Sequence, residues 1–111
     1  MVSMQVTQGS IITINLNPTQ GHEQAGYRPA LVVNNADHSR ASNMTLVCPI
    51  TNTDRKSPLH VRLDDLMTTG FVMCDQIRAL DIRSQQYKVI ETVDKDTLWE
   101  VCDIVQGLVE V

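Results

Sequence analysis

A long polar loop near the start of the chain holds the residues with the most varied chemistry. It spans residues 17–29 and reads NPTQGHEQAGYRP. His22 titrates near neutral pH and could transfer a proton. Arg28 lies where the loop enters a strand, and its planar fork of donors suits a phosphate. The plainer alternatives are a His22 without a role and an Arg28 in a solvated ion pair with Glu23.

Two further polar residues follow apolar segments, where strands are expected to end. Thr51 comes directly after Pro49-Ile50, and Asp75 comes directly after the apolar run at residues 71–74. A hydroxyl at a strand end can orient a phosphate or cap the turn. A carboxylate there can move a proton or only form the turn. The residue types alone leave these roles open.

Alternating apolar and polar residues predict the elements that would position these groups. The expected strands are residues 10–16, 29–33, 44–50, 60–63, 71–74 and 87–92, with residues 34–43 as a loop or a single helical turn. Asp94 is the expected N-cap of a C-terminal amphipathic helix. Its apolar face would comprise Leu98, Val101, Cys102, Val105 and Leu108, and Trp99, Ile104 and Val109 would point elsewhere. The pattern predicts one α+β domain, residues 1–111, with a small, strongly curved antiparallel sheet or barrel.

Composition bounds the class of protein. The chain has 111 residues, of which 42% are hydrophobic and 4% aromatic, so a single domain with an aliphatic core is expected. Its three cysteines share no metal-binding spacing, which favours reduced thiols in a cytoplasm and argues against a metal site. We expect no signal peptide and no membrane span.

The net charge of −4 is distributed unevenly. From residue 91 onward there are one basic and six acidic residues, whereas residues 1–90 are close to neutral. The acidic end is typical of a solvated helix face. A near-neutral body can present a small cationic cleft but is no broad nucleic-acid-binding surface.

Three segments resemble the MazF/PemK/Kid toxins of bacterial toxin–antitoxin pairs. They are NPTQGHEQAGYRPALVV at residues 17–33, CPITNT at 48–53 and TTGFVMCDQIRALDIR at 68–83. The resemblance implies a small SH3-like antiparallel barrel with a C-terminal helix, and a homodimer. It also implies a metal-independent ribonuclease that needs no cofactor and cuts single-stranded messenger RNA at short sequences. A flexible, acidic MazE/PemI-like antitoxin would inhibit it.

The resemblance also implies roles for individual residues. Arg28 and Thr51 match residues regarded as catalytic in chromosomal MazF proteins, and His22 and Asp75 match residues with roles in the plasmid Kid branch. That branch uses an arginine two residues before the aspartate, where this chain has Met73. Arg28 and Thr51 are therefore preferred, with His22 or Asp75 assisting. The expected RNA contacts are Glu23, Gln24, Tyr27, Arg55, Lys56, Gln76 and Arg78.

Elementary chemistry agrees with such a reaction. If the ribose 2′-hydroxyl is the nucleophile, RNA cleavage needs no metal, and a guanidinium stabilises the charge that develops on the phosphate. A second group must move a proton, and the products are a 2′,3′-cyclic phosphate and a 5′-hydroxyl.

Two other functions use a similar fold. One is a CcdB-like toxin that poisons gyrase, and the other is a non-catalytic barrel that binds RNA or protein. CcdB-type chains end in Trp-Gly-Ile, whereas this chain ends Val109-Glu110-Val111.

Overall fold

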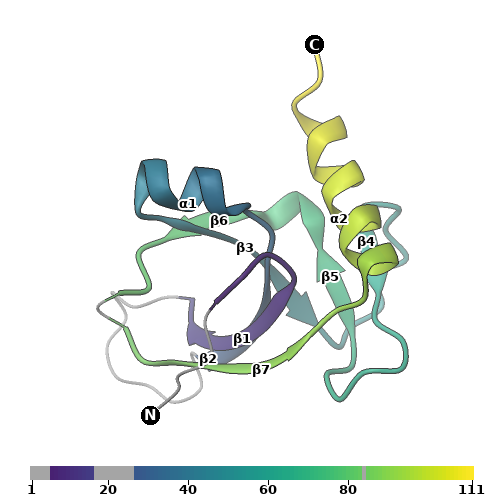
Figure 1. Ribbon diagram of the computed structural model, residues 1–111. Helices are drawn as coiled ribbons and strands as arrows, with labels where there is room; N and C mark the ends of the chain where they lie inside the picture. Colours follow the sequence, from purple (N-terminus) through teal and green to yellow (C-terminus); the bar gives the residue numbers. More distant parts are fainter. Residues whose placement is uncertain (1–5, 17–26, 84) are drawn as a thin grey trace.

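The computed structural model describes residues 6–16, 27–83 and 85–111 (Figure 1). In chain order the elements are β1 (Ser10–Asn15), β2 (Tyr27–Val32), α1 (Ala36–Ser42), β3 (Thr45–Thr51), β4 (His60–Arg62), β5 (Phe71–Met73), the 3-10 turn η3 (Cys74–Gln76), β6 (Arg78–Leu80), β7 (Tyr87–Thr92) and α2 (Lys95–Leu108). Antiparallel strands and two helices confirm the predicted α+β class.

The sheet has the order β4-β5-β3-β2-β1-β7, and β6 pairs with β3 beside this path. Every pairing is antiparallel. In the described part of the chain β4 and β7 end the path without pairing, so the sheet curves strongly but does not close into a barrel.

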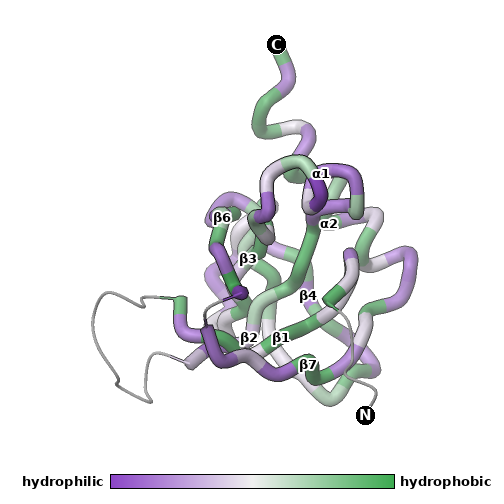
Figure 2. Tube along the Cα trace, turned by 60° about the vertical axis from the view of Figure 1, so that its left-hand side comes forward, coloured by the Kyte–Doolittle hydropathy of each residue, from purple (hydrophilic) through white to green (hydrophobic). Residues whose placement is uncertain are grey.

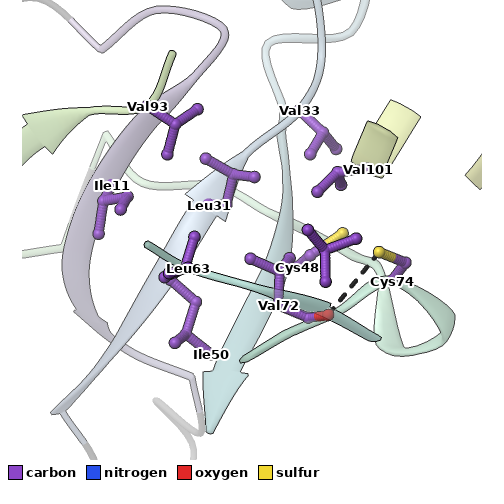
Figure 3. Close-up of a cluster of buried hydrophobic side chains, with 11 residues drawn as sticks. Ile11, Leu31, Val33, Cys48, Ile50, Leu63, Val72, Cys74, Val93 and Val101 are labelled. Atoms are coloured by element: carbon purple, nitrogen blue, oxygen red, sulfur yellow. Dashed lines mark hydrogen bonds between the residues drawn. The ribbon is translucent and has the colours of Figure 1, made fainter. Parts of the chain in front are cut away.

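Two apolar clusters lie on the two faces of the sheet because successive strand residues point to opposite sides. Ile11, Leu31 and Cys48 belong to one cluster, which also receives Val101 from α2 (Figure 3). The second cluster contains residues next to these in the strands, such as Ile12 and Val47. Hydrophobic stretches accordingly follow the central strands, and much of α1 and of the loops is polar (Figure 2).

Pro29 lies inside β2, so the expectation that it begins the strand was wrong. It pairs with Thr13 of β1, and the pairing of β2 with β3 stops at Ala30↔Pro49. Proline has no N–H to donate to a ladder. Its ring is tolerated here because the missing donor falls on the β3 side, where the ladder ends.

The C-terminal helix begins as predicted. The Asp94 carboxylate accepts hydrogen bonds from the hydroxyl (2.6 Å) and the N–H (3.3 Å) of Thr97. The first of these contacts lowers the pKa of Asp94.

The apolar face of α2 differs from the prediction at two positions. Ile104 packs against the cluster that contains Val101, whereas Leu108 is 43% exposed. Ile104 lies on the edge of a wider apolar stripe, and the last turn of the helix projects beyond the sheet (Figure 1). Trp99 and Val109 are exposed as expected, at 71% and 77%.

One helical segment is longer than predicted, and one short strand was missing from the prediction. The polar stretch at residues 34–43 forms a seven-residue helix, α1, rather than a loop or one turn. Its N-terminus is capped by the Asn35 side chain, which accepts from the His38 N–H, and it ends at Asn43 with φ of 57°. The short strand β6 pairs with the first half of β3. No helix among the described residues is long and apolar enough to cross a membrane.

A single carboxylate ties together the two ends of the open sheet. Glu91 of β7 accepts hydrogen bonds from the N–H groups of Met67 (3.1 Å) and Thr68 (2.7 Å) and from the Thr68 hydroxyl (2.7 Å). Met67 and Thr68 lie in the connection between β4 and β5. Burial alone would raise the pKa of Glu91, but these hydrogen bonds outweigh it and lower the pKa below 4.5.

Glu91→Gln is expected to lower the free energy of unfolding by about 1 kcal/mol at pH 7, because it weakens hydrogen bonds to a charged but partly solvated acceptor. A lowered pKa stabilises the fold above the unfolded value of 4.5 and ceases to do so as pH falls through the folded value. The difference between variant and parent in urea unfolding should therefore shrink below pH 4.5. Glu110→Gln, at an exposed position, is the control. A difference independent of pH would contradict the assignment.

Candidate functional site

Strand register places several polar residues on one face of the sheet. Thr51 of β3 lies opposite Phe71 of β5, and Phe71 lies opposite Arg62 of β4. In the next row of the same face, Met73 of β5 lies opposite His60 of β4. Residues opposite each other in antiparallel strands point to the same side. We call this side, with Arg28, Thr51, Phe71, Arg62, Met73 and His60, the site face.

Arg28 joins this face through β2. Ala30 of β2 lies opposite Pro49 of β3, and Arg28 and Thr51 each lie two residues beyond this last pair, so alternation puts their side chains on the same side of the sheet. The Arg28 side chain is exposed, and within the described residues it makes no ion pair. The two residues preferred from the sequence therefore lie on the same side of the sheet, a cation and a hydroxyl just past the last paired residues of β2 and β3. Glu23, the alternative partner of Arg28, lies outside the described residues.

The Thr51 hydroxyl accepts a hydrogen bond from the Thr53 N–H at 3.2 Å, so it does cap the turn. Its own proton remains available to donate to a ligand. The backbone around it is held by Gly70, which has φ of 121°. A Cβ on Gly70 would lie 2.4 Å from the Thr51 carbonyl oxygen, so this close approach requires glycine.

Gly70→Ala is expected to destabilise the fold by about 1–3 kcal/mol, since it combines an unfavourable φ with a clash against backbone. It should also displace Thr51. Thermal unfolding would measure the loss, and Gly107→Ala is the matched control, because nothing lies within 4 Å of its Cβ. Unchanged stability of Gly70→Ala would contradict this role.

Asp75 lies in η3, immediately beyond β5. Its side chain is 38% exposed, and its Oδ1 is 3.5 Å from Nε2 of His60. Along the chain, Asp75 lies four residues after Phe71, which is the residue opposite Thr51. Two of these steps are in β5 and two are in the 3-10 turn, which corresponds to about 11 Å between the backbone of Phe71 and that of Asp75. The structure thus places Asp75 at the other end of β5 from Thr51, with Met73 between them.

The other residues predicted to contact RNA spread around these groups. Tyr27 and Arg28 open β2, and Gln76 follows Asp75; all are exposed. Arg78 is exposed and lies opposite Val47, on the same side of β3 as Thr51. Arg55 and Lys56 lie in the loop after β3, where Lys56 is paired with Asp54 at 3.1 Å. The other predicted residues, His22, Glu23 and Gln24, lie outside the described residues.

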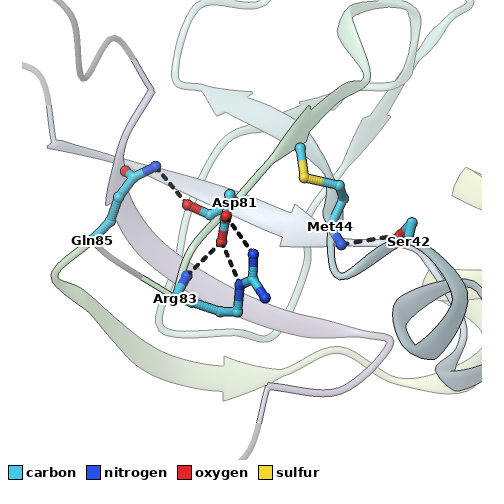
Figure 4. A network of polar contacts seen from close by, with 5 residues as sticks. All are labelled: Ser42, Met44, Asp81, Arg83 and Gln85. Atoms are coloured by element: carbon cyan, nitrogen blue, oxygen red, sulfur yellow. Dashed lines mark hydrogen bonds and ion pairs between the residues drawn. The ribbon is translucent and has the colours of Figure 1, made fainter.

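A cavity of about 950 Å³ lies elsewhere, between the N-terminal segment, α1 and residues 82–87, and none of the predicted site residues lines it. Its two cations are already neutralised, Arg40 by Asp37 and Arg83 by Asp81 (2.8 Å; Figure 4). Hydrogen bonds from Arg83 lower the pKa of Asp81 to about 2. Among the described residues that line this cavity there is no His, Cys, Asp or Glu.

His60 is the residue of the site that the sequence did not single out. Its side chain is only 6% exposed. The alternation in residues 60–63 placed it in a strand, but its contact with Asp75 depends on pairing between β4 and β5. Among residues 6–16, 27–83 and 85–111, no group of three His, Cys, Asp or Glu side chains could hold a metal ion.

Comparison with known proteins agrees with the arrangement. Residues 7–109 match the model of a family described as PemK-like, MazF-like toxin of type II toxin–antitoxin system. Endoribonuclease PemK of Escherichia coli is 38% identical over 99 residues, covering 85% of this chain and 74% of the relative. The endoribonuclease toxin MazF of Escherichia coli K12 is 33% identical over 86 residues, covering 77% of this chain and 78% of the relative.

Solved structures show the same fold. MazF from Deinococcus radiodurans has a TM-score of 0.80 and 31% identity, covering 96% of this chain and 97% of that one. A MazE–MazF structure from the same organism has a TM-score of 0.79 and 27% identity, covering 96% of each chain. The family match spans all three segments that carry the resemblance and confirms it. The chain therefore belongs to the PemK-like, MazF-like toxins of type II toxin–antitoxin systems.

Proposed function

We propose that the chain, acting as one toxin domain over residues 1–111, is a metal-independent endoribonuclease that cleaves single-stranded messenger RNA at short sequences. The observation that supports this proposal is the register of β2 on β3, by which Arg28 and Thr51 lie on one side of the sheet beyond the last paired residues, with Arg28 exposed. The names of the curated relatives, endoribonucleases PemK and MazF, support the same activity.

Arg28 and Thr51 bind the scissile phosphate. The guanidinium supplies two parallel N–H donors to the phosphate oxygens, and its charge stabilises the extra negative charge of the pentacovalent transition state. The Thr51 hydroxyl donates to one of the two non-bridging oxygens, since its acceptor side already serves the Thr53 N–H. Thr51 is thus an orienting group, and a hydroxyl is a poor base.

Asp75 takes the proton of the attacking 2′-hydroxyl. It is a half-exposed carboxylate about 11 Å from the row of Thr51 along the strand. A phosphodiester and its adjoining ribose bridge such a gap when a hydrogen bond of about 3 Å is made at each end. As the bond from O2′ to phosphorus forms, the bond to O5′ breaks and that oxygen gains a proton. His22 is the candidate donor for this second transfer.

The remaining residues guide the RNA to this centre. The contacts with the RNA strand are assigned to these residues: Tyr27, Arg55, Lys56, Gln76 and Arg78, together with Glu23 and Gln24 of residues 17–26. Exposed cations bind backbone phosphates, and an aromatic ring such as that of Tyr27 can stack on a base.

We assign the enzyme two protein partners in the cytoplasm, where messenger RNA and reduced thiols occur together. The first is a cognate MazE/PemI-like antitoxin, as in the MazE–MazF structure of Deinococcus radiodurans. The second is another copy of the chain, whose two-fold dimer would cover part of the apolar surface around Trp99 and Val109.

Sedimentation equilibrium at micromolar concentration is expected to give the mass of two chains. Trp99→Glu should shift the mass toward one chain, because a charge replaces an apolar side chain in the contact. Asp103→Asn, an exposed change on the same helix, should leave the dimer intact. A single-chain mass for the parent that does not rise with concentration would defeat the dimer.

Incubation of a long in vitro transcript with the purified protein in excess EDTA tests the activity. Cleavage at a limited set of sites is expected, with 5′-hydroxyl ends and cyclic phosphates detected by end-labelling before and after phosphatase treatment. An intact transcript would reject the enzyme and favour a gyrase poison or a non-catalytic binding protein. Loss of cleavage in EDTA that is restored by added magnesium would reject the metal-independent mechanism.

A further inference from the structure

The most unusual side chain on the site face is that of His60. It is 6% exposed, although it lies on a three-residue strand at the end of the sheet path. Its Nδ1 is buried and has no hydrogen-bond partner among the described residues. A buried polar atom without a partner costs about 1–3 kcal/mol. This unfavourable burial makes His60 a candidate for a functional role.

The other ring nitrogen faces Asp75. Nε2 of His60 lies 3.5 Å from Oδ1 of Asp75, and the ring lies opposite Met73 in the strand register. Met73 carries no charge and cannot exchange a proton. Within the described part of the chain, His60 is thus the one basic side chain at ion-pair distance from Asp75.

This geometry determines which nitrogen carries the proton. A proton on Nδ1 alone would leave a buried donor without an acceptor and would aim the lone pair of Nε2 at a carboxylate oxygen. A proton on Nε2 lies instead on the nitrogen that is 3.5 Å from Oδ1 and offers the carboxylate a donor, whereas Nδ1 then stays a buried acceptor without a partner among the described residues. Of the two neutral tautomers, the one with its proton on Nε2 is therefore the one that the carboxylate favours.

We propose that His60 is the positioning residue of Asp75: its Nε2–H holds Oδ1 of the carboxylate and leaves Oδ2 turned to the RNA as the proton acceptor. This inference rests on the proposed ribonuclease activity and on the role of Asp75 in it. The donor limits rotation of the carboxylate, and it does not itself touch the substrate.

The neighbouring titratable groups do not reproduce this effect. Cys48 of β3 and Cys74 of η3 are near Asp75, and burial raises the pKa of each thiol to about 12, so both are neutral during the reaction. Cys102 and Glu100 of α2 also act on this region, and burial raises the pKa of the Cys102 thiol. On the site face, Arg62 is paired with Asp64 at 3.2 Å. Arg78 of β6 is exposed.

The experiment compares three variants with the parent in single-turnover cleavage of a long in vitro transcript in EDTA, between pH 5 and 8.5. His60→Leu removes the donor and keeps an apolar side chain, and it should cleave about tenfold more slowly at pH 7, the effect expected for one hydrogen bond to a charged group. His60→Gln keeps an N–H at a similar position, so it should retain most of the rate. His38→Gln is the matched control at the histidine of α1.

Two outcomes would overturn the inference while the activity stands. One is a His60→Leu enzyme with the rate of the parent. The other is equal loss in His60→Gln and His60→Leu, which indicates a purely steric role. Urea unfolding of each variant separates these results from a folding defect.

Nuclear magnetic resonance provides a readout that does not depend on cleavage. In protein with ¹⁵N-labelled histidine, His60 should show the tautomer with its proton on Nε2 at pH 7.5, and Asp75→Asn should reduce that preference. A proton on Nδ1 would overturn the inference. If the parent fails to cleave RNA but shows the predicted tautomer, the contact stands and the proposed activity falls.

Discussion

Arg28→Ala is expected to cleave RNA about 10²–10³-fold more slowly than the parent while keeping its fold. The magnitude is that of one preorganised electrostatic donor removed from a transition state. The fold should persist because Arg28 is exposed and makes no ion pair within the described residues. Single-turnover cleavage in EDTA measures the rate, and urea unfolding measures the stability.

Two further variants define what Arg28 contributes. Arg28→Lys restores the charge but not the planar pair of donors, so it should recover only part of the rate. Arg40→Ala removes an equally exposed arginine from α1, where it is paired with Asp37, and should cleave at the parent rate. Cleavage by Arg28→Ala close to that of the parent would remove Arg28 from the mechanism.

Asp75→Asn is expected to lower the cleavage rate by about 10²–10⁴-fold, the range for loss of a group that transfers a proton in the transition state. An amide of the same size can still contact RNA, so binding of an uncleavable 2′-deoxy oligonucleotide should change little. The acid limb of the pH–rate profile should disappear with the carboxylate. Asp103→Asn on α2 is the control for a change of charge elsewhere.

A result in which Asp75→Asn weakens binding and cleavage equally would assign Asp75 to recognition of the RNA rather than to proton transfer. The base would then have to be sought in His22, which lies outside the described residues. Thr51→Ala separates the roles further, because an orienting donor lowers the rate without altering its pH dependence.

Local sequence patterns predicted the elements whose stability is local or strongly periodic. The strand at residues 87–92 has the predicted bounds, and α2 starts after Asp94 as its capping residues require. The helix α1 was missed because it buries no residue and so has no apolar stripe; capping by Asn35 and Asn43 holds it instead. The strand β6 was missed because three residues carry no periodicity, and only its partner β3 defines it.

For the candidate site, too, the sequence predicted the residues but not their arrangement in space. Residue type and position at a strand end were enough to select Arg28, Thr51 and Asp75. Their arrangement was not predictable, since it depends on the register of β2 on β3 and on the length of β5. The role of His60 depends on a contact with a residue fifteen positions away in sequence, and alternation in its own strand contains no information about that neighbour.

The Glu91 carboxylate also governs transient opening of the contact between β7 and the connection from β4 to β5. The N–H groups of Met67 and Thr68 are both hydrogen-bonded to this one side chain. Their exchange with solvent deuterium therefore reports the opening of this contact alone. The connection that they belong to continues to Thr69, whose hydroxyl donates to Asn52 at 2.9 Å, and to Gly70, which contacts Thr51. Opening of this contact is therefore expected to loosen the backbone that carries Thr51, because the residues bonded to Glu91 lie directly before Thr69 and Gly70 in the same connection.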